Sequence, residues 1–383
     1  MGNVPNLRFP EFSGEWVTKS INDLAVVIGG GTPDTTVKSY WDGEIQWFTP
    51  SEIGKNKYVD SSLRTITEVG LNNSSAKLLP PNTILLSSRA TIGECSLSLR
   101  ECATNQGFQC LVSKKCNVDF LYYLIQTKKK DLIRKSCGST FLEISANEVR
   151  KIQVSVPSDV EQQKIAELLS LIDERIATQN KIIEDLKKLK CAIIEKLYSK
   201  IQGKEYSYGQ LFDVVNERNK QMEYYNILSA SQEKGMVNRD DLNLDIQFER
   251  SNINTYKIVR KGDYVIHLRS FQGGFAFSDK LGVCSPAYTI LRPNSLLEYS
   301  YLSYYFTSQR FIKSLIIVTY GIRDGRSINV EEWLNMKVVI PSKEHQLHTL
   351  NVLKRIDDKV ENEEKYATCL SNQKQYLLRQ MFI

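Results

Sequence analysis

Cysteine and histidine spacing decides whether a chain can hold a metal ion or a reactive thiol. The chain has eight cysteines and three histidines. No two cysteines form a C-x-x-C pair, and only His345 and His348 lie close together. This spacing does not predict a zinc site. The N-terminus lacks an apolar signal core, and the cysteines lack ligand spacing. We therefore expect them to be reduced and to be buried like small apolar side chains.

Other motifs do not predict catalysis. The glycine run Gly29–Gly31 lacks the later Gly-Lys of a phosphate-binding Walker A loop. Leu79-Pro80-Pro81-Asn82 has the two prolines of an amino-methyltransferase motif without its flanking residues, and we interpret it as a turn. Pro33-Asp34 lacks the acidic-x-Lys element of a metal-dependent nuclease. His267 lies in a strand-like run without a nucleophile to activate. We therefore expect a binding protein with no catalytic residue, metal or cofactor of its own.

Five polar loops, at 47–51, 87–91, 104–107, 268–274 and 322–327, carry side chains of the types that read duplex DNA. Arginine reads guanine and asparagine or glutamine reads adenine, while serine, threonine and lysine hold phosphates. The proposed DNA contacts are Ser88, Arg89, Thr91, Asn105 and Gln106 in the first half and Arg269, Gln272, Arg323 and Arg326 in the second. Each loop also fits a solvated or turn-forming role, so that alternative stays open. We expect Lys128–Lys130 to form a solvated helix face, and Trp41 and Trp47 to pack in the core.

An internal duplication organises these loops. Shifting the sequence by 184 residues aligns 157–199 with 341–383 without a gap, and nine of the 43 aligned pairs are identical. Average composition gives roughly two or three identities by chance. The chain is therefore a tandem of two similar halves.

Each repeated segment predicts a long helix that begins after a Pro-Ser pair. Apolar residues recur in steps of four and three, which is a heptad pattern. The first seam contains Ile165, Leu169, Ile172, Ile176 and Leu186, and the second contains Leu353, Ile356, Val360 and Leu370. At about 1.5 Å per residue each helix extends about 60 Å, which favours antiparallel pairing of the two helices over packing on one domain.

Polar residues interrupt both seams at the same two places. They are Gln179 and Lys190 in the first helix, and Glu363 and Lys374 in the second. Such residues either weaken the pairing of the two helices or contact helices of another chain, and the sequence leaves both alternatives open.

The predicted fold class is α+β, with two mixed domains separated by two long antiparallel helices in a pseudo-twofold tandem repeat. Short strand-like runs with glycine and proline punctuation precede each long helix. We expect target-reading domains at 1–157 and 201–341, a central spacer helix at 158–200 and a C-terminal spacer helix at 342–383.

The composition is that of a globular protein. The 383 residues are 42% hydrophobic and 25% charged, which excludes wholesale disorder. No apolar run is long enough to span a bilayer, and we expect a cytoplasmic protein. The net charge of +6 permits a polyanionic partner without requiring one.

Several of these segments together resemble the specificity subunit of type I restriction-modification systems, the HsdS family. The resemblance covers essentially the whole chain. It is carried by Pro5–Trp16, Gly30–Pro33, Tyr40-Trp41, Trp47, Ser88–Gly93, Asn105–Phe108 and the paired Pro-Ser helices with their Gln and Ile-Asp residues. One departure is that Glu161, before Gln162 in the first helix, corresponds to His345 before Gln346 in the second. Docking at the second helix could therefore differ.

The resemblance implies a function and a set of partners. Two target-recognition domains would each read one half of a split site in double-stranded DNA. The helices would act as a spacer that docks methyltransferase subunits, two in number, and restriction subunits would join them. S-adenosylmethionine, ATP and Mg would then be needed in the partner subunits. The alternative is a coiled-coil adaptor that organises partner proteins without reading DNA. A single-chain methyltransferase-nuclease would need a catalytic region that the sequence lacks.

Overall fold

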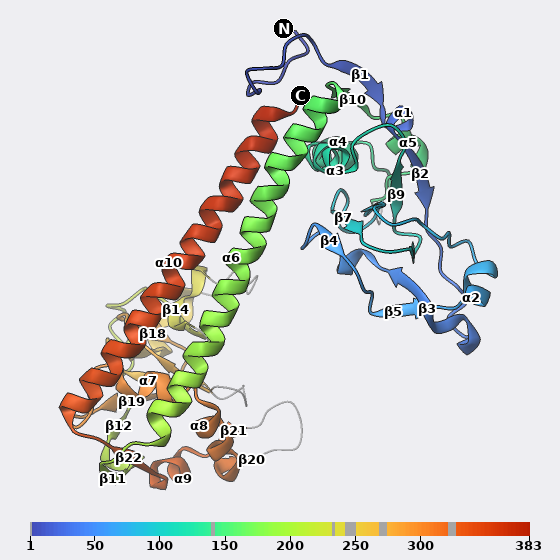
Figure 1. Cartoon of the computed structure of the whole chain (residues 1–383). Helices are drawn as coiled ribbons and strands as arrows, with labels where there is room; N and C mark the ends of the chain where they lie inside the picture. Colours follow the sequence, from blue (N-terminus) through green and yellow to red (C-terminus); the bar gives the residue numbers. More distant parts are fainter. Residues whose placement is uncertain (1, 139–141, 232–233, 242–249, 268–273, 321–326) are drawn as a thin grey trace. The chain divides into compact units, whose positions relative to one another are not determined.

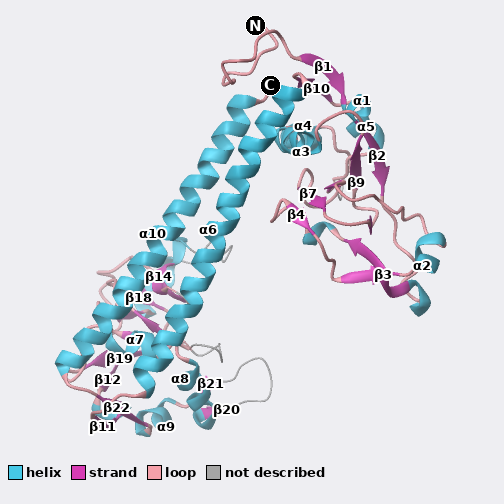
Figure 2. Ribbon diagram, viewed as in Figure 1, coloured by secondary structure: helices cyan, strands magenta, loops and turns pink. Residues whose placement is uncertain are grey.

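A computed structural model provides the architecture (Figures 1 and 2). The structure describes residues 2–138, 142–231, 234–241, 250–267, 274–320 and 327–383. Contacts divide the chain into two compact units, one formed by 1–180 with 365–383 and the other by 181–364. Each unit contains strands, short helices and part of both long helices, so the predicted α+β fold class is confirmed.

The first unit is built on a five-stranded sheet. Its strand order is β2 (Ala25–Gly29), β9 (Gln109–Ser113), β6 (Ile84–Leu86), β7 (Cys95–Ser98) and β4 (Tyr58–Val59). A second sheet contains β5 (Arg64–Ile66), β3 (Trp41–Phe48) and β8 (Cys102–Thr104), and β1 (Val17–Ser20) pairs with β10 (Gln153–Val156). The short helices are α1 (Ile21–Leu24), α2 (Glu68–Asn72), α3 (Val118–Thr127), α4 (Lys129–Arg134) and α5 (Ala146–Arg150).

The second unit repeats this plan. Its main sheet has the order β12 (Phe212–Val215), β19 (Thr289–Pro293), β16 (Tyr264–Ile266) and β17 (Phe275–Phe277), and β11 (Lys204–Ser207) pairs with β22 (Lys337–Ile340). The other strand pairs are β13 (Leu228–Ser231) with β14 (Gly235–Asn238), β15 (Lys257–Val259) with β18 (Gly282–Cys284), and β20 (Thr319–Tyr320) with β21 (Ser327–Ile328). The short helices are α7 (Tyr301–Tyr305), α8 (Gln309–Ser314) and α9 (Val330–Asn335).

Two long helices match the heptad prediction. Helix α6 covers Asp159–Ser199 and α10 covers Lys343–Met381 (Figure 1). Every one of the predicted seam positions in both helices is buried or half-buried. The start of α6 and the end of α10 belong to one hydrophobic core, which includes Leu169 and Leu378. The end of α6 and the start of α10 belong to the other, which includes Ile194 and Leu353. Each core is thus closed by both helices.

Both helix starts are fastened to their units by a glutamine. The Gln162 Nε2 donates to the carbonyl of Pro157, and its Oε1 accepts from the backbone of Asn117, which caps α3. Gln346 makes the equivalent bond to Pro341 and accepts from the backbone of Glu298. Since Gln162 and Gln346 are buried, this repeated residue orients each helix against its domain.

Glu161 has a role that the second helix lacks. Its carboxylate is 1% exposed and accepts two hydrogen bonds from the Arg8 guanidinium, at 2.7 and 2.8 Å, and a third from the Trp16 indole. This pairing raises the pKa of Arg8. His345, at the corresponding position, is exposed. The departure between the helices therefore reflects an N-terminal segment that the first helix start binds.

Lysines at the second polar break of each seam form ion pairs between the helices. In the first unit, Lys374 Nζ lies 2.6 Å from Asp173, whose other oxygen accepts from the Tyr123 hydroxyl at 2.7 Å. In the second unit Lys190 pairs with Asp357, which accepts from Tyr304 at 2.7 Å. The end of each helix thus pairs with the start of the other, as antiparallel helices require, and both lysines have a partner within the chain.

The Lys374 pair offers a test of this register. We expect Lys374→Ala to lower the free energy of unfolding by about 1–2 kcal/mol, because Asp173 would lose its cation in a partly buried seam. The double exchange Lys374→Asp with Asp173→Lys should recover part of that loss. Chemical denaturation measures both. If the double exchange lost more unfolding free energy than Lys374→Asp and Asp173→Lys lose together, the assigned pair would be contradicted.

The cysteines follow their predicted environment in part. Cys95, Cys102, Cys110 and Cys284 are buried and Cys116 is half-buried, whereas Cys137, Cys191 and Cys369 are exposed. Burial raises the pKa of each of the first five thiols to about 12. A raised pKa keeps a thiol protonated and unreactive at neutral pH.

This contrast predicts the number of reactive thiols. With a disulfide reagent at pH 8, three thiols of the native protein should react rapidly and the other five only after denaturation. Absorbance of the released thiolate gives the count. Rapid reaction of a fourth thiol before denaturation would show that one of the buried cysteines is accessible.

Candidate nucleic-acid interface

Three loops of the first unit meet at one end of its main sheet. In the strand register Gly29 faces Gln109, Leu86 faces Cys95, and Ser87 bridges to Phe108. The chain therefore leaves β2 and β6, and enters β9 and β7, at the same end. This places loops 30–34, 87–94 and 105–108 together, as the predicted DNA contacts in this half require.

The glycine run brings two of these loops into close contact. A Cβ atom on Gly30 would overlap the carbonyl oxygen of Asn105. The Gly31 amide donates to the Thr104 carbonyl at 2.8 Å, and the Gly31 carbonyl accepts from the Trp47 indole at 2.9 Å. Trp47 is buried, as predicted. The glycines thus have a packing role, because only residues without a side chain allow this approach.

Gln106 is the most accessible of the predicted base readers in this loop cluster. Its side chain is exposed, and its Oε1 accepts a hydrogen bond from the Thr32 hydroxyl of the neighbouring loop. Its amide nitrogen therefore points its donors away from that contact. Asn105 is half-buried, and its Oδ1 accepts from the Gly107 backbone at 2.9 Å. Asn105 shapes the turn that presents Gln106.

Arg89 and Thr91 lie on the adjacent loop. The Arg89 guanidinium is 43% exposed and lies 2.9 Å from the Glu143 carboxylate. The exposed Thr91 donates to the Ser87 hydroxyl at 3.1 Å. Ala90 between them has a φ of +54°, so the backbone turns sharply here. Arg89 can reach a base only by leaving or sharing Glu143.

The prediction for Ser88 needs correction. Ser88 is 0% exposed, its amide donates to Gly107 and its carbonyl accepts from the Ile144 amide. A buried hydroxyl cannot touch DNA while the loop keeps this conformation. Ser88 instead joins the loops through backbone hydrogen bonds to Gly107 and Ile144, and its side chain is buried.

The predicted contacts of the second half lie outside the described residues. Arg269 and Gln272 fall in the connection between β16 and β17, which corresponds in strand order to the Arg89 loop of the first unit. Arg323 and Arg326 fall in the connection between β20 and β21. Their role as DNA contacts stays a prediction.

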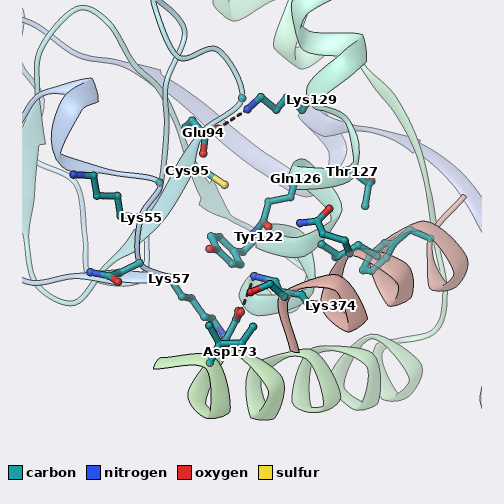
Figure 3. Close-up of a pocket in the computed structure, with 18 of the residues that line it drawn as sticks. Lys55, Lys57, Glu94, Cys95, Tyr122, Gln126, Thr127, Lys129, Asp173 and Lys374 are labelled. Atoms are coloured by element: carbon teal, nitrogen blue, oxygen red, sulfur yellow. Dashed lines mark hydrogen bonds and ion pairs between the residues drawn. The ribbon is translucent and has the colours of Figure 1, made fainter. Parts of the chain in front are cut away.

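A basic cavity next to these loops was not predicted. It has a volume of about 1240 Å³ and lies within the first unit, between segments 54–58 and 93–95, helices α3 and α4, and the facing parts of α6 and α10 (Figure 3). Lys128–Lys130 line it, although we had predicted only a solvated face for them. Lys55 and Lys57, two residues apart in a polar loop, are a further sequence signal that our prediction did not include.

Several ion pairs organise the wall of this cavity. Lys57 lies 2.6 Å from Asp119, and its ammonium group also faces the Tyr123 ring at 5.0 Å. Lys129 pairs with Glu94, and Lys374 pairs with Asp173 (Figure 3). Burial lowers the pKa of Lys128, which donates to the carbonyl of Ile383 at 2.6 Å.

Metal and membrane features complete the survey. Among the residues that the structure describes, histidine, cysteine and acidic side chains do not gather in groups of three or more that could bind a metal ion. The described helices include none with the length and apolarity required to cross a bilayer.

Comparison with known proteins gives a consistent set of relatives. Residues 13–188 match the family described as type I restriction modification DNA specificity domain. The specificity subunit of the type I restriction enzyme MjaIX from Methanocaldococcus jannaschii is 36% identical over 207 residues, which cover 52% of this chain and 48% of that protein. The match therefore spans about half the length of this relative.

Solved structures share the fold over almost the whole chain. The S subunit of a type I restriction-modification system from M. genitalium has a TM-score of 0.54 at 16% identity, covering 99% of both chains. A chain from a structural study of assembly and conformational transition in the type I R-M system has a TM-score of 0.62 at 14% identity, covering 96% of this chain and 97% of that one. At these identities the likeness shows the fold.

Proposed function

We propose that this chain is the DNA specificity subunit of a type I restriction-modification complex, because residues 13–188 match the family described as type I restriction modification DNA specificity domain. In this role it recognises a bipartite site in double-stranded DNA. The observation that carries the proposal is the repeated sheet order, β2-β9-β6-β7 and β12-β19-β16-β17, with polar loops at the equivalent strand ends.

Each unit would read one half-site. The first unit presents Gln106, Arg89 and Thr91 from loops at one end of its sheet, and these side chains have the donors and acceptors that base edges and phosphates require. The second unit would use Arg269 and Gln272 from the corresponding connection. Since the loops of the two units differ in sequence, the two half-sites would differ as well.

The chemistry would reside in partner subunits. Without a nucleophile, general base or phosphate-binding motif in its sequence, this chain would be a non-catalytic subunit. Methyltransferase subunits, two in number, would bind S-adenosylmethionine and flip the target bases, and restriction subunits would use ATP and Mg. The paired helices α6 and α10 would dock the methyltransferases and act as the spacer, and the complex would meet its DNA in the cytoplasm.

Methylation profiling tests this proposal. The gene should be expressed with its methyltransferase partner in a host that lacks other modification systems, and modified bases mapped by single-molecule sequencing. We expect one motif of two defined halves separated by an undefined spacer. Matched expression of the methyltransferase alone is the control.

A binding experiment separates DNA reading from the adaptor alternative. The complex should bind its motif with an affinity that falls steeply as salt increases, because lysine and arginine release counterions from phosphates. An adaptor would co-purify with methyltransferase and leave the methylation pattern and the DNA affinity of that enzyme unchanged.

A further inference from the structure

Unpaired positive charge remains in the basic cavity of the first unit after its ion pairs are counted. Lys57, Lys129 and Lys374 have carboxylate partners. In the described part of the chain, Lys55 and Lys130 form no ion pair, and neither does Arg379, although all three line the cavity. Glu174 is the acidic side chain of the lining that has no cation partner among the described residues. The cavity therefore carries an excess of exposed cations over carboxylates.

The cavity continues toward the predicted reading loop. A second hollow beside Arg89, Ala90 and Thr91 shares Glu94 and Lys129 with the basic cavity. Gly93 also lines the cavity, with a φ of +88° and the Lys129 side chain against it. A DNA strand bound at loop 87–94 could therefore continue along the two connected hollows to helices α6 and α10.

We propose that this basic cavity binds the sugar-phosphate backbone of the DNA that flanks the first half-site. The inference rests on the proposed DNA-reading function and assigns a second contact to the same ligand. Three exposed cations contributed by the 54–58 loop, by α4 and by α10 lie on separate elements, which suits successive phosphates of one strand better than one small anion.

The ion pairs fix two of the lysines in the wall of the cavity. Asp173 and Asp119 hold Lys374 and Lys57 against aromatic rings, so these lysines shape the wall. The exposed side chains of Lys55, Lys130 and Arg379 are left to contact phosphates. Backbone contacts of this kind position a protein on the duplex without reading sequence.

The test compares salt dependence in the full complex with methyltransferase. The triple variant Lys55→Gln, Lys130→Gln, Arg379→Gln should bind the motif duplex at least about tenfold more weakly near 0.15 M salt. The slope of log K against log salt should be smaller by up to about three, since each lost phosphate contact removes roughly 0.9. The methylated motif should stay unchanged. Lys115→Gln is the matched control, because Lys115 is exposed beyond the opposite end of β9.

Three outcomes would overturn the inference in distinguishable ways. An unchanged slope in the triple variant, with wild-type binding intact, would exclude backbone contacts in the cavity. Loss of methyltransferase co-purification by a folded triple variant would make the cavity a protein-docking site. If the wild-type complex itself bound DNA without salt dependence or preference, the proposed function would fail together with this inference. Thermal unfolding of the triple variant identifies any loss of folding.

Discussion

Replacing Leu169 with aspartate is expected to unfold the first unit. Leu169 is 0% exposed and belongs to the core that joins α3, the start of α6 and the end of α10. Removing a buried leucine side chain costs about 3 kcal/mol, and burying a carboxylate without a partner adds several more. The total of at least about 5 kcal/mol is comparable to the whole stability of a typical domain.

Circular dichroism during thermal unfolding and peptide-level hydrogen exchange measure this effect. Exchange should rise throughout 2–180 and 365–383, and methyltransferase should no longer co-purify. Leu171→Asp is the matched control, because Leu171 lies on the same helix and is 64% exposed, so stability should change by less than about 0.5 kcal/mol. Leu353→Asp should repeat the loss in the second unit, whose core contains Leu353. Equal melting temperatures for Leu169→Asp and Leu171→Asp would contradict the assigned seam.

The helices could be predicted because their signal is local. Apolar residues in steps of three and four lie on one face of a helix whatever surrounds them, so burial of Leu169, Ile172 and Val360 follows from spacing alone. The polar breaks could not be resolved in the same way. Lys374 reaches Asp173 from the opposite helix, and its partner depends on the register between two segments that lie far apart in the sequence.

The reading loops were predicted as a group but not in detail. Side-chain type located loops 87–91 and 104–107, and strand register brings them together. Ser88 was mistaken for a surface residue because its burial comes from the backbone around Ile144, 56 positions later. Arg89 likewise pairs with Glu143, which no local pattern indicates.

The basic cavity shows the same limit on a larger scale. Lys55, Lys130 and Arg379 come from three segments that lie far apart in the sequence. The excess of cations arises only when folding brings these segments together and the carboxylates pair with Lys57, Lys129 and Lys374, which leaves the other three cations unpaired. Net charge of the chain therefore gave no indication of where phosphate contacts would lie.

Gln106→Ala is expected to relax recognition of the first half-site. Glutamine reads adenine through two hydrogen bonds, and a good pair of this kind discriminates by about 1–3 kcal/mol. The Thr32 hydroxyl holds the Gln106 oxygen and so orients the amide before DNA binds. We therefore expect the preference for one base pair of the first half-site to fall roughly 5-fold to 150-fold. Methylation profiling should show that position becoming degenerate while the second half-site stays intact.

Two further variants separate base reading from general weakening at this loop. Thr32→Val keeps the side-chain shape and removes the hydroxyl, so affinity should fall less than in Gln106→Ala while the preferred base stays the same. Gln153→Ala removes an exposed glutamine from β10, outside the loop cluster, and should leave binding unchanged. If Gln106→Ala weakened binding equally for every base at every position, Gln106 would be a backbone contact, and base reading by the first unit would have to rest on Arg89 after release from Glu143.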